Sequence, residues 1–354
     1  MNIALWAPFF KKEISDFEEF IVETMPHFIL QQPNGKFFIL TDTMPSFQPP
    51  FPGNTEIVVT KPPQQNTLLK KIWWDVKLPS VLKKIKTDLF VSFADNCSLT
   101  AAIPQFMVIY DAEKLRSSLI KKSRLIFVMS QSMKTQLIKT HKIPQEKIVV
   151  IYPAPGRQYS PADANKRDDI KEAYSEGKEF FLYSSPFKKQ EDLIELLKSF
   201  SHFKKRQQSN YKLLLLTGSN PSVEKKLSAY KYRDDIKFIA TKDKSIQAAI
   251  TAAAYTAVLP FNTTDNMIAA LNAMKAGVPV ITTKNSTVKE VAGDAAVYAE
   301  NEIKDIGDKL IQLYTNEDFR SGLIEKGKDR VKAFTHNKAS ELLWQSIIGA
   351  YKMI

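Results

Sequence analysis

Several residue types that build common active sites are scarce in this chain. Cysteine occurs once, at Cys97, which excludes an internal disulfide and a cysteine-based zinc or iron–sulfur centre. The four histidines stand far apart, so none pair as ligands on one helical turn would, and a zinc enzyme is disfavoured. Glycine contributes only 11 of 354 residues, and neither the dinucleotide fingerprint nor the P-loop pattern occurs. These absences argue against nicotinamide dehydrogenases and NTPases.

Long apolar runs are also missing. No stretch approaches the roughly 20 apolar residues that a membrane-crossing helix needs. The opening MNIALWAPFF turns charged at Lys11, Lys12 and Glu13, which is too early for a secretory signal. We therefore expect a soluble cytoplasmic protein. Its net charge of +12 is spread over both halves of the chain, and this spread disfavours a dedicated nucleic-acid-binding face.

The chain does contain a regular alternation of short β-branched and aromatic runs with longer segments of helical period. This alternation predicts parallel sheets with helices on both faces. It lapses around Pro153 and Pro161, where we place a boundary between residues 1–157 and 158–335. We expect an α/β protein of two doubly wound, Rossmann-like domains that face a cleft. Segment 336–354 carries a broad apolar stripe, and we expect it to pack back on the first domain.

The strand candidates are spaced by these helical segments, and after residue 297 the pattern becomes wholly helical. In the first domain they are 3–6, 37–40, 57–60, 88–93, 106–110, 125–129 and 148–151. In the second domain they are 180–183, 213–217, 236–239, 257–259 and 278–282.

Ligands of open α/β sheets bind where the strands end. The strongest such place is a strand that ends at Pro260, followed by a polar turn and a helix that opens at Asp265. The free backbone N–H groups of that helix start are suited to a phosphate. From the residues alone, Thr264 or Asp265 is more simply interpreted as a helix cap. Glu290, after the next strand, is likewise either a loop-capping carboxylate or a ligand contact.

Segment 66–86 is basic and contains Trp73 and Trp74. It is suited to a peripheral contact with an anionic membrane surface or with an acidic glycan. The alternative is a helix with a solvated lysine face and tryptophans in the core. Pro79 is expected to interrupt any long continuous helix here.

The stretch 252–298 contains a run of residues that fits a known signature without a gap. These residues are Leu271, Ala273, Met274, Gly277, Val278, Pro279, Val280, Ile281, Glu290, Val291, Gly293, Asp294, Ala295 and Ala296. The stretch thereby resembles the carboxy-terminal signature of the family-four retaining glycosyltransferases, which have the two-domain GT-B fold. The resemblance extends over 123–335 and is weak over the first 120 residues. It implies that a nucleotide sugar binds in the cleft between the two domains.

The chain departs from the family at its two characteristic glutamates, which stand eight positions apart. The aligned positions hold Thr264 and Asn272. Asn272 retains the ability to hydrogen-bond a ribose, whereas Thr264 has no negative charge to offer an oxocarbenium-like centre. The neighbouring carboxylate of Asp265 is the substitute that the resemblance implies, so Asp265 and Thr264 are the candidate catalytic residues.

The remaining site residues are also implied by the resemblance. The family's arginine and lysine for the donor diphosphate align with Gln190 and Glu191, and Lys188 and Lys189 lie two residues earlier. The family's His-Asp pair in the first domain becomes Tyr110-Asp111. The implied donor-binding residues are Lys188, Lys189, Thr263, Asn266, Asn272 and Glu290, and the acceptor-side residues are Phe9, Phe10, Asp95 and Asp111.

The resemblance implies a hexosyltransferase that transfers a sugar from a nucleotide-sugar donor to a glycan or lipid-linked acceptor, with retention. No Asp-x-Asp motif occurs, which fits a metal-independent enzyme without a cofactor, with the nucleotide sugar as substrate. Loss of both glutamates favours an alternative, a catalytically impaired protein that acts as a binding or scaffold partner in glycan assembly. An epimerase of the same fold is a third hypothesis. The implied location is the cytoplasm, with peripheral contact at the inner membrane surface through 66–86.

Overall fold

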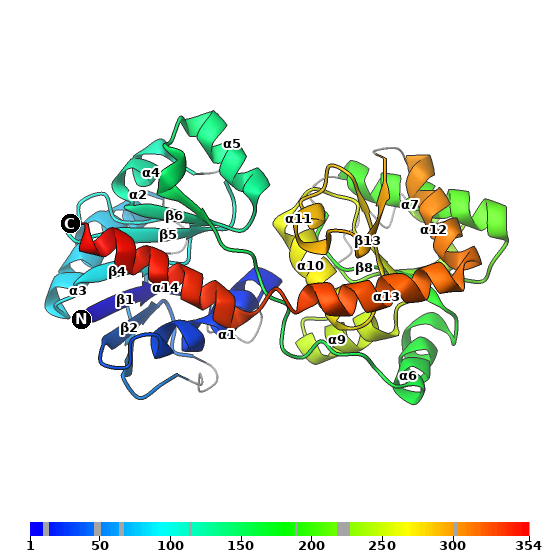
Figure 1. Ribbon diagram of the computed structural model, residues 1–354, viewed down its shortest axis with the longest axis horizontal. Helices are drawn as coiled ribbons and strands as arrows, with labels where there is room; N and C mark the ends of the chain where they lie inside the picture. The colour runs from blue at the N-terminus through cyan, green and yellow to red at the C-terminus, as the bar shows by residue number, and fades with distance from the viewer. Residues whose placement is uncertain are drawn as a thin grey trace. The chain divides into compact units, whose positions relative to one another are not determined.

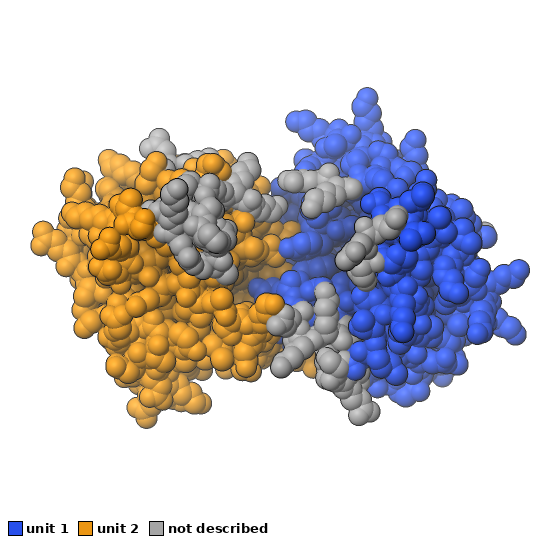
Figure 2. Space-filling view, turned by 180° about the vertical axis from the view of Figure 1, so that it is seen from behind, with its two compact units in different colours: residues 1–153, 336–354 blue, residues 154–335 orange. Residues whose placement is uncertain are grey.

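The computed structural model describes residues 1–9, 14–45, 51–63, 67–112, 115–187, 190–217, 227–300 and 303–353. The chain forms two compact units (Figure 2). Unit 1 comprises residues 1–153 and 336–354, and unit 2 comprises residues 154–335. Each unit contains one parallel sheet with helices on its faces, which confirms the predicted α/β class (Figure 1).

Unit 1 contains seven parallel strands in the order β3-β2-β1-β4-β5-β6-β7. The central strands are buried on both faces and therefore read as near-continuous apolar runs. Strands β2 and β3 extend the sheet on one side of β1, and strands β4 to β7 extend it on the other side. The strands are β1 (Asn2–Trp6), β2 (Lys36–Thr41), β3 (Thr55–Val59), β4 (Leu89–Ser92), β5 (Gln105–Ile109), β6 (Leu125–Val128) and β7 (Ile148–Val150).

Two helices of unit 1, α1 and α5, begin at serine side-chain caps, Ser15 and Ser130. Helix α1 starts at a capping box, in which the Ser15 hydroxyl accepts from the Glu18 amide at 3.2 Å and the Glu18 carboxylate accepts from the Ser15 amide at 2.7 Å. The helices are α1 (Asp16–Leu30), α2 (Thr67–Ile72), η1 (Trp73–Lys77), α3 (Leu78–Lys84), α4 (Ser117–Lys122), α5 (Gln131–His141), η2 (Gln145–Lys147) and α14 (His336–Lys352).

Helix α14 returns the end of the chain to unit 1, where it packs along α1 (Figure 1). His336 Nε2 lies 3.0 Å from Glu23 Oε2, and His336 Nδ1 lies 2.9 Å from the Thr24 hydroxyl. The Trp344 ring meets Phe28 edge to face at 5.4 Å. These contacts place the apolar stripe of α14 against the first helix of the chain.

Unit 2 contains six parallel strands in the order β10-β9-β8-β11-β12-β13, and the chain reverses its direction of growth between β8 and β11. The strands are β8 (Phe180–Tyr183), β9 (Lys212–Leu215), β10 (Ile236–Phe238), β11 (Thr256–Val258), β12 (Val280–Thr283) and β13 (Ala296–Ala299). The helices are α6 (Ala164–Ser175), α7 (Gln190–Gln207), η3 (Arg233–Asp235), α9 (Lys244–Ala253), α10 (Thr264–Lys275), α11 (Val288–Ala292), α12 (Ile303–Thr315) and α13 (Glu317–Val331).

Two local expectations were wrong. Strand β13 was not predicted, because its four residues, AVYA, form a short edge strand that is fixed by pairing with β12 rather than by its own pattern. Pro79 does not interrupt its helix. The chain stays helical from α2 through α3, because a π-helical turn precedes the proline and Leu78 N bonds to Trp73 O.

Among the described residues, no helix is both long enough and apolar enough to span a membrane.

Candidate functional site

Each sheet has one point where the strand order reverses, and ligands of such sheets bind beyond the carboxyl ends of the strands at that point. In unit 1 the reversal lies between β1 and β4, and in unit 2 it lies between β8 and β11.

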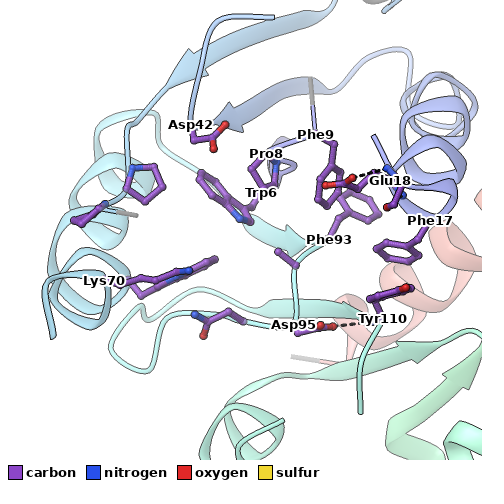
Figure 3. A pocket seen from close by; sticks show the side chains of 16 residues that line it. Trp6, Pro8, Phe9, Phe17, Glu18, Asp42, Lys70, Phe93, Asp95 and Tyr110 are labelled. Carbon is purple, nitrogen blue, oxygen red and sulfur yellow. Dashed lines mark hydrogen bonds between the residues drawn. The ribbon is translucent and has the colours of Figure 1, made fainter. Parts of the chain in front are cut away.

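Unit 1 contains a pocket of about 520 Å³ at its reversal point (Figure 3). It is lined by Trp6, the last residue of β1, and by Phe9 and Phe93, which follow β1 and β4. Three carboxylates line it, from Glu18, Asp42 and Asp95, and Lys70 enters from α2. The complete lining is Trp6, Pro8, Phe9, Ser15, Phe17, Glu18, Asp42, Pro62, Pro63, Lys70, Trp74, Phe93, Ala94, Asp95, Asn96 and Tyr110.

The aromatic wall of this pocket is packed against neighbouring tryptophan rings. Trp6 packs on Trp73 at 5.0 Å and on Trp74 at 5.6 Å between ring centroids. Trp73 Nε1 donates to the Thr60 carbonyl at 3.3 Å, which satisfies its polar atom. Both Trp73 and Trp74 are buried, so the interpretation of these tryptophans as core residues is confirmed.

Asp95 is the most perturbed carboxyl in the pocket. Its Oδ1 accepts from the Tyr110 amide at 2.7 Å, and its Oδ2 accepts from the Asp111 amide at 3.3 Å. Burial raises the pKa of Asp95 from 3.8 to about 6, although the two amide hydrogen bonds oppose that rise. A carboxyl with this pKa exchanges protons near neutral pH, which is the property required of a general base.

The structure brings together two of the four residues predicted on the acceptor side. Phe9 and Asp95 both line the pocket. Asp111 contributes its backbone amide to Asp95, and its side chain is not part of the lining. Phe10 lies outside the described residues. Reasoning from the sequence missed Glu18, Asp42 and Lys70, of which Asp42 had a usable signal because it directly follows a strand.

In unit 2, α10 begins at the reversal point. Thr263 is the N-cap, and its hydroxyl accepts from the Asn266 amide at 3.0 Å. The helix therefore starts at Thr264, one residue earlier than expected, and the cap is neither Thr264 nor Asp265. Both of these residues are half-buried in the first turn, where the backbone N–H groups carry the positive end of the helix dipole.

The bend before α10 is fixed by its own polar side chains. Asn266 Nδ2 donates to the Phe261 carbonyl at 2.6 Å, and the Thr283 hydroxyl donates to the Pro260 carbonyl at 2.9 Å. Asn262 Oδ1 accepts from the Thr287 amide at 3.1 Å. Asn266 is completely buried, so its side chain shapes the bend and offers no surface to a ligand.

Asn272 is also buried. Its Oδ1 accepts from the Gly156 amide at 2.9 Å, which ties the start of unit 2 to the middle of α10. Glu290 lies half-buried on α11, and Arg330 donates to its backbone carbonyl at 3.0 Å. Lys188 and Lys189 fall outside the described residues, immediately after Phe187.

An aromatic cluster that was not predicted lies beside the start of α10. Tyr183, the last residue of β8, stacks on Phe187 at 4.4 Å and meets Phe261 edge to face at 5.8 Å. Burial, followed by the negative charges of Asp192 and Asp265, raises the pKa of Tyr183. Asp265 therefore lies close enough to this cluster for its charge to be felt there. The sequence did contain a signal for this cluster. Phe187 and Phe261 each follow a strand, β8 and β11, and these two strands are neighbours in the sheet.

Within the ranges that the structure describes, no three carboxylate, histidine or cysteine side chains gather as a metal-binding cluster. The candidate chemistry therefore consists of a helix start with a nearby carboxylate in unit 2, and an aromatic, carboxylate-lined pocket in unit 1.

Two doubly wound parallel sheets, each with its own reversal point, define the GT-B fold. Residues 165–330 match the family model of group 1 glycosyl transferases. The matched stretch lies within unit 2, and it confirms the resemblance to the glycosyltransferases at the level of this family model.

The comparisons with individual proteins agree. The O-antigen chain mannosyltransferase B of Escherichia coli is 23% identical over 256 residues, which span 71% of this chain and 66% of that relative. The structure of Anabaena HepE in complex with UDP and glucose has a TM-score of 0.76 at 10% identity, and the match covers 99% of this chain and 100% of that one. Sucrose-phosphate synthase from Thermosynechococcus elongatus has a TM-score of 0.75 at 12% identity, with both chains fully covered. Both structural likenesses establish the fold.

Proposed function

We propose that the protein is a hexosyltransferase that moves a sugar from a nucleotide-sugar donor to a glycan or lipid-linked acceptor, with retention at the anomeric carbon and without a metal ion or cofactor. The observation that carries the proposal is the match of residues 165–330 to the group 1 family. The E. coli relative is by name a mannosyltransferase, and HepE was solved with UDP and glucose, so both fit this substrate class.

The proposed donor site is the edge of unit 2 at β8 and β11. The diphosphate rests on the first turn of α10, where the amide of Thr264 and the helix dipole attract an anion. Lys188 and Lys189 are the proposed cations for the same group, and the half-exposed rings of Phe187 and Phe261 are suited to pack against the nucleoside. Fixed dipoles and charges of this kind stabilise the negative charge that develops on a leaving diphosphate.

Asp265 is the proposed substitute for the missing glutamate. It lies in the first turn of α10 beside the position held by Thr264, and its carboxylate is suited to offset positive charge at the anomeric carbon. The same carboxylate weakens the attraction of the helix start for phosphate. Asp265 therefore has opposite expected effects on diphosphate binding and on turnover, which makes it a sharp test residue. Glu290 on α11 is the proposed partner of a donor hydroxyl.

The proposed acceptor site is the pocket of unit 1. Sugar rings present apolar C–H faces and a rim of hydroxyls, and the pocket offers the half-buried ring of Tyr110 together with carboxylate acceptors. Asp95, with its raised pKa, is placed to accept a proton from the acceptor hydroxyl.

Donor turnover with the full-length chain tests the proposal. The protein is incubated with UDP- and GDP-activated hexoses, and release of free nucleoside diphosphate is followed together with binding by calorimetry. One donor is expected to bind and to be turned over.

The scaffold hypothesis is favoured by one observation, the absence of both family glutamates at Thr264 and Asn272. Nucleotide binding without any turnover would replace the transferase proposal with the scaffold hypothesis. Absence of heat with every nucleotide, in folded protein, would contradict donor binding altogether.

A further inference from the structure

Unit 1 contains a second cavity at the opposite end of its sheet from the pocket described above. Its volume is about 930 Å³, which is within the range of small-molecule sites. Residues at the starts of β5, β6 and β7 line it, together with residues at the end of α14. In Figure 1 the end of α14 lies at the same end of unit 1 as the start of β1. We call this space the basal cavity.

The topology of the sheet gathers cations in the basal cavity. Arg124 directly precedes β6 and Lys147 directly precedes β7, and the register of these two neighbouring strands places their starts side by side. Lys121 and Lys122, the last two residues of α4, line the same cavity. The lining therefore has four cations against a single acid, Glu146.

These cations have no acidic partners of their own. Lys147 Nζ donates to the Lys121 carbonyl at 3.0 Å, so a backbone oxygen holds the ammonium group in place. None of the four cations forms an ion pair within the part of the chain that the structure describes. Burial, followed by the positive charge of Arg124, lowers the pKa of Lys147. The two like charges are therefore close enough to repel each other, and an anion bound between them relieves that repulsion.

The rest of the lining is largely apolar. Ile103, Leu125 and Val149 are half-buried in the cavity wall, and Met353 is exposed beside them. Lysine and arginine side chains bind phosphate oxygens through charge-assisted hydrogen bonds. An inorganic anion gains nothing from an apolar wall, whereas the organic part of a phosphorylated metabolite packs against it. Cations and apolar wall together therefore indicate an organic phosphate.

We propose that the basal cavity binds a small organic phosphate that carries at least two negative charges. The cavity shares no lining residue with the pocket at the other end of the sheet, so this is a separate site. Its recognition chemistry is independent of the proposed transferase function, because every lining residue belongs to unit 1 and none has a role in the proposed transfer.

Calorimetry of the full-length chain tests the site, with ATP as the probe and tripolyphosphate in a parallel titration. ATP is expected to bind at least as tightly as tripolyphosphate, although it carries less charge, because its ring system packs against the apolar wall. The double variant Lys122→Gln, Arg124→Gln is expected to bind ATP about tenfold more weakly. The matched control Lys83→Gln, Lys139→Gln removes two exposed charges outside the lining and is expected to stay within about twofold of wild type.

These titrations have outcomes that contradict the proposal. Equal ATP affinity of the wild type and the Lys122, Arg124 variant, both folded by circular dichroism, would overturn the basal site. Tighter binding of tripolyphosphate than of ATP would overturn the organic part of the ligand. Binding of a soluble acidic polysaccharide that ATP fails to displace would show that the cations hold a polymer instead of a metabolite.

Hydrogen–deuterium exchange of the wild-type chain locates the bound phosphate, since ATP is also a candidate for the proposed donor site of unit 2. Saturating ATP is expected to slow exchange in 121–125, 145–149 and 345–353. Protection confined to 260–267 would assign the phosphate to the donor site alone and would overturn the basal site. Failure of donor turnover, in contrast, would contradict the proposed function and leave the basal site standing.

Discussion

Asn272 Oδ1 accepts a hydrogen bond from the backbone N–H of Gly156 at 2.9 Å, across 116 residues of sequence. The family resemblance implied a ribose contact for Asn272, but the structure uses its carbonyl oxygen to hold the start of unit 2 against α10. Lys275, one turn further along the same helix, donates to the Gly156 carbonyl at 2.8 Å. Both polar groups of Gly156 are thus satisfied by one helix.

Replacement of Asn272 is expected to destabilise unit 2. Asn272→Ala leaves the Gly156 amide buried without an acceptor, which costs about 1–3 kcal/mol. Urea unfolding followed by circular dichroism measures the loss. Asn285→Ala, at an exposed position, is the control and is expected to stay within about 0.5 kcal/mol of wild type. A neutral effect of Asn272→Ala on stability, combined with a large loss of nucleotide affinity, would return Asn272 to the ligand site.

The acid in the first turn of α10 is expected to separate binding from turnover. Asp265→Asn removes a negative charge from the helix start, so affinity for UDP or GDP stays equal or rises by up to about fivefold. Donor turnover is expected to fall at least tenfold, because the substitute carboxylate is lost. Asp318→Asn, an exposed first-turn acid on α13, is the control. Undiminished turnover in Asp265→Asn would remove this residue from the catalytic assignment.

Asp95 is expected to make stability depend on pH. Its pKa is about 6 in the folded chain and near 3.8 when unfolded, so the unfolded state loses the proton first. Stability therefore falls as pH rises from about 4 to about 6 and is flat above. The free energy of unfolding of Asp95→Asn relative to wild type should rise by about 2–3 kcal/mol between pH 4 and pH 7. Urea unfolding at several pH values measures this difference, and a constant difference would show that the pKa of Asp95 is not raised.

Helix α14 is expected to stabilise α1. Trp344→Ala removes the edge-to-face contact with Phe28 and part of the buried surface of unit 1, at a cost of about 1–3 kcal/mol. Hydrogen–deuterium exchange is expected to accelerate in α1 and to stay unchanged in α13. Leu342→Ala, at an exposed position on the same helix, is the matched control. Unchanged protection of α1 in Trp344→Ala would contradict the packing described for α14.

The α/β class was predictable because buried parallel strands read as apolar runs, and helices with an apolar stripe separate them. Strand β13 and the helix that continues past Pro79 were not predictable in this way. The four residues of β13 are held by the register with β12. The π-helical turn before Pro79 includes Trp73, whose Nε1 donates a hydrogen bond to the Thr60 carbonyl. No local sequence pattern predicts this contact.

The candidate site was predictable only in part. Phe9 and Asp95 follow two strands that neighbour each other in the sheet, so their meeting follows from topology. Glu18 and Lys70 reach the same pocket from helices, and their direction depends on how those helices pack. The Asn272–Gly156 bond joins distant segments, and sequence spacing has no means of showing it.

The central claim is that a nucleotide sugar binds to unit 2 at the first turn of α10. Hydrogen–deuterium exchange of the full-length chain, with and without a saturating donor identified by calorimetry, tests it directly. We predict slower exchange of the backbone amides in 183–187 and 260–267, with the exposed end of α13 unaffected. Donor binding that leaves both of these segments unprotected would contradict the claim.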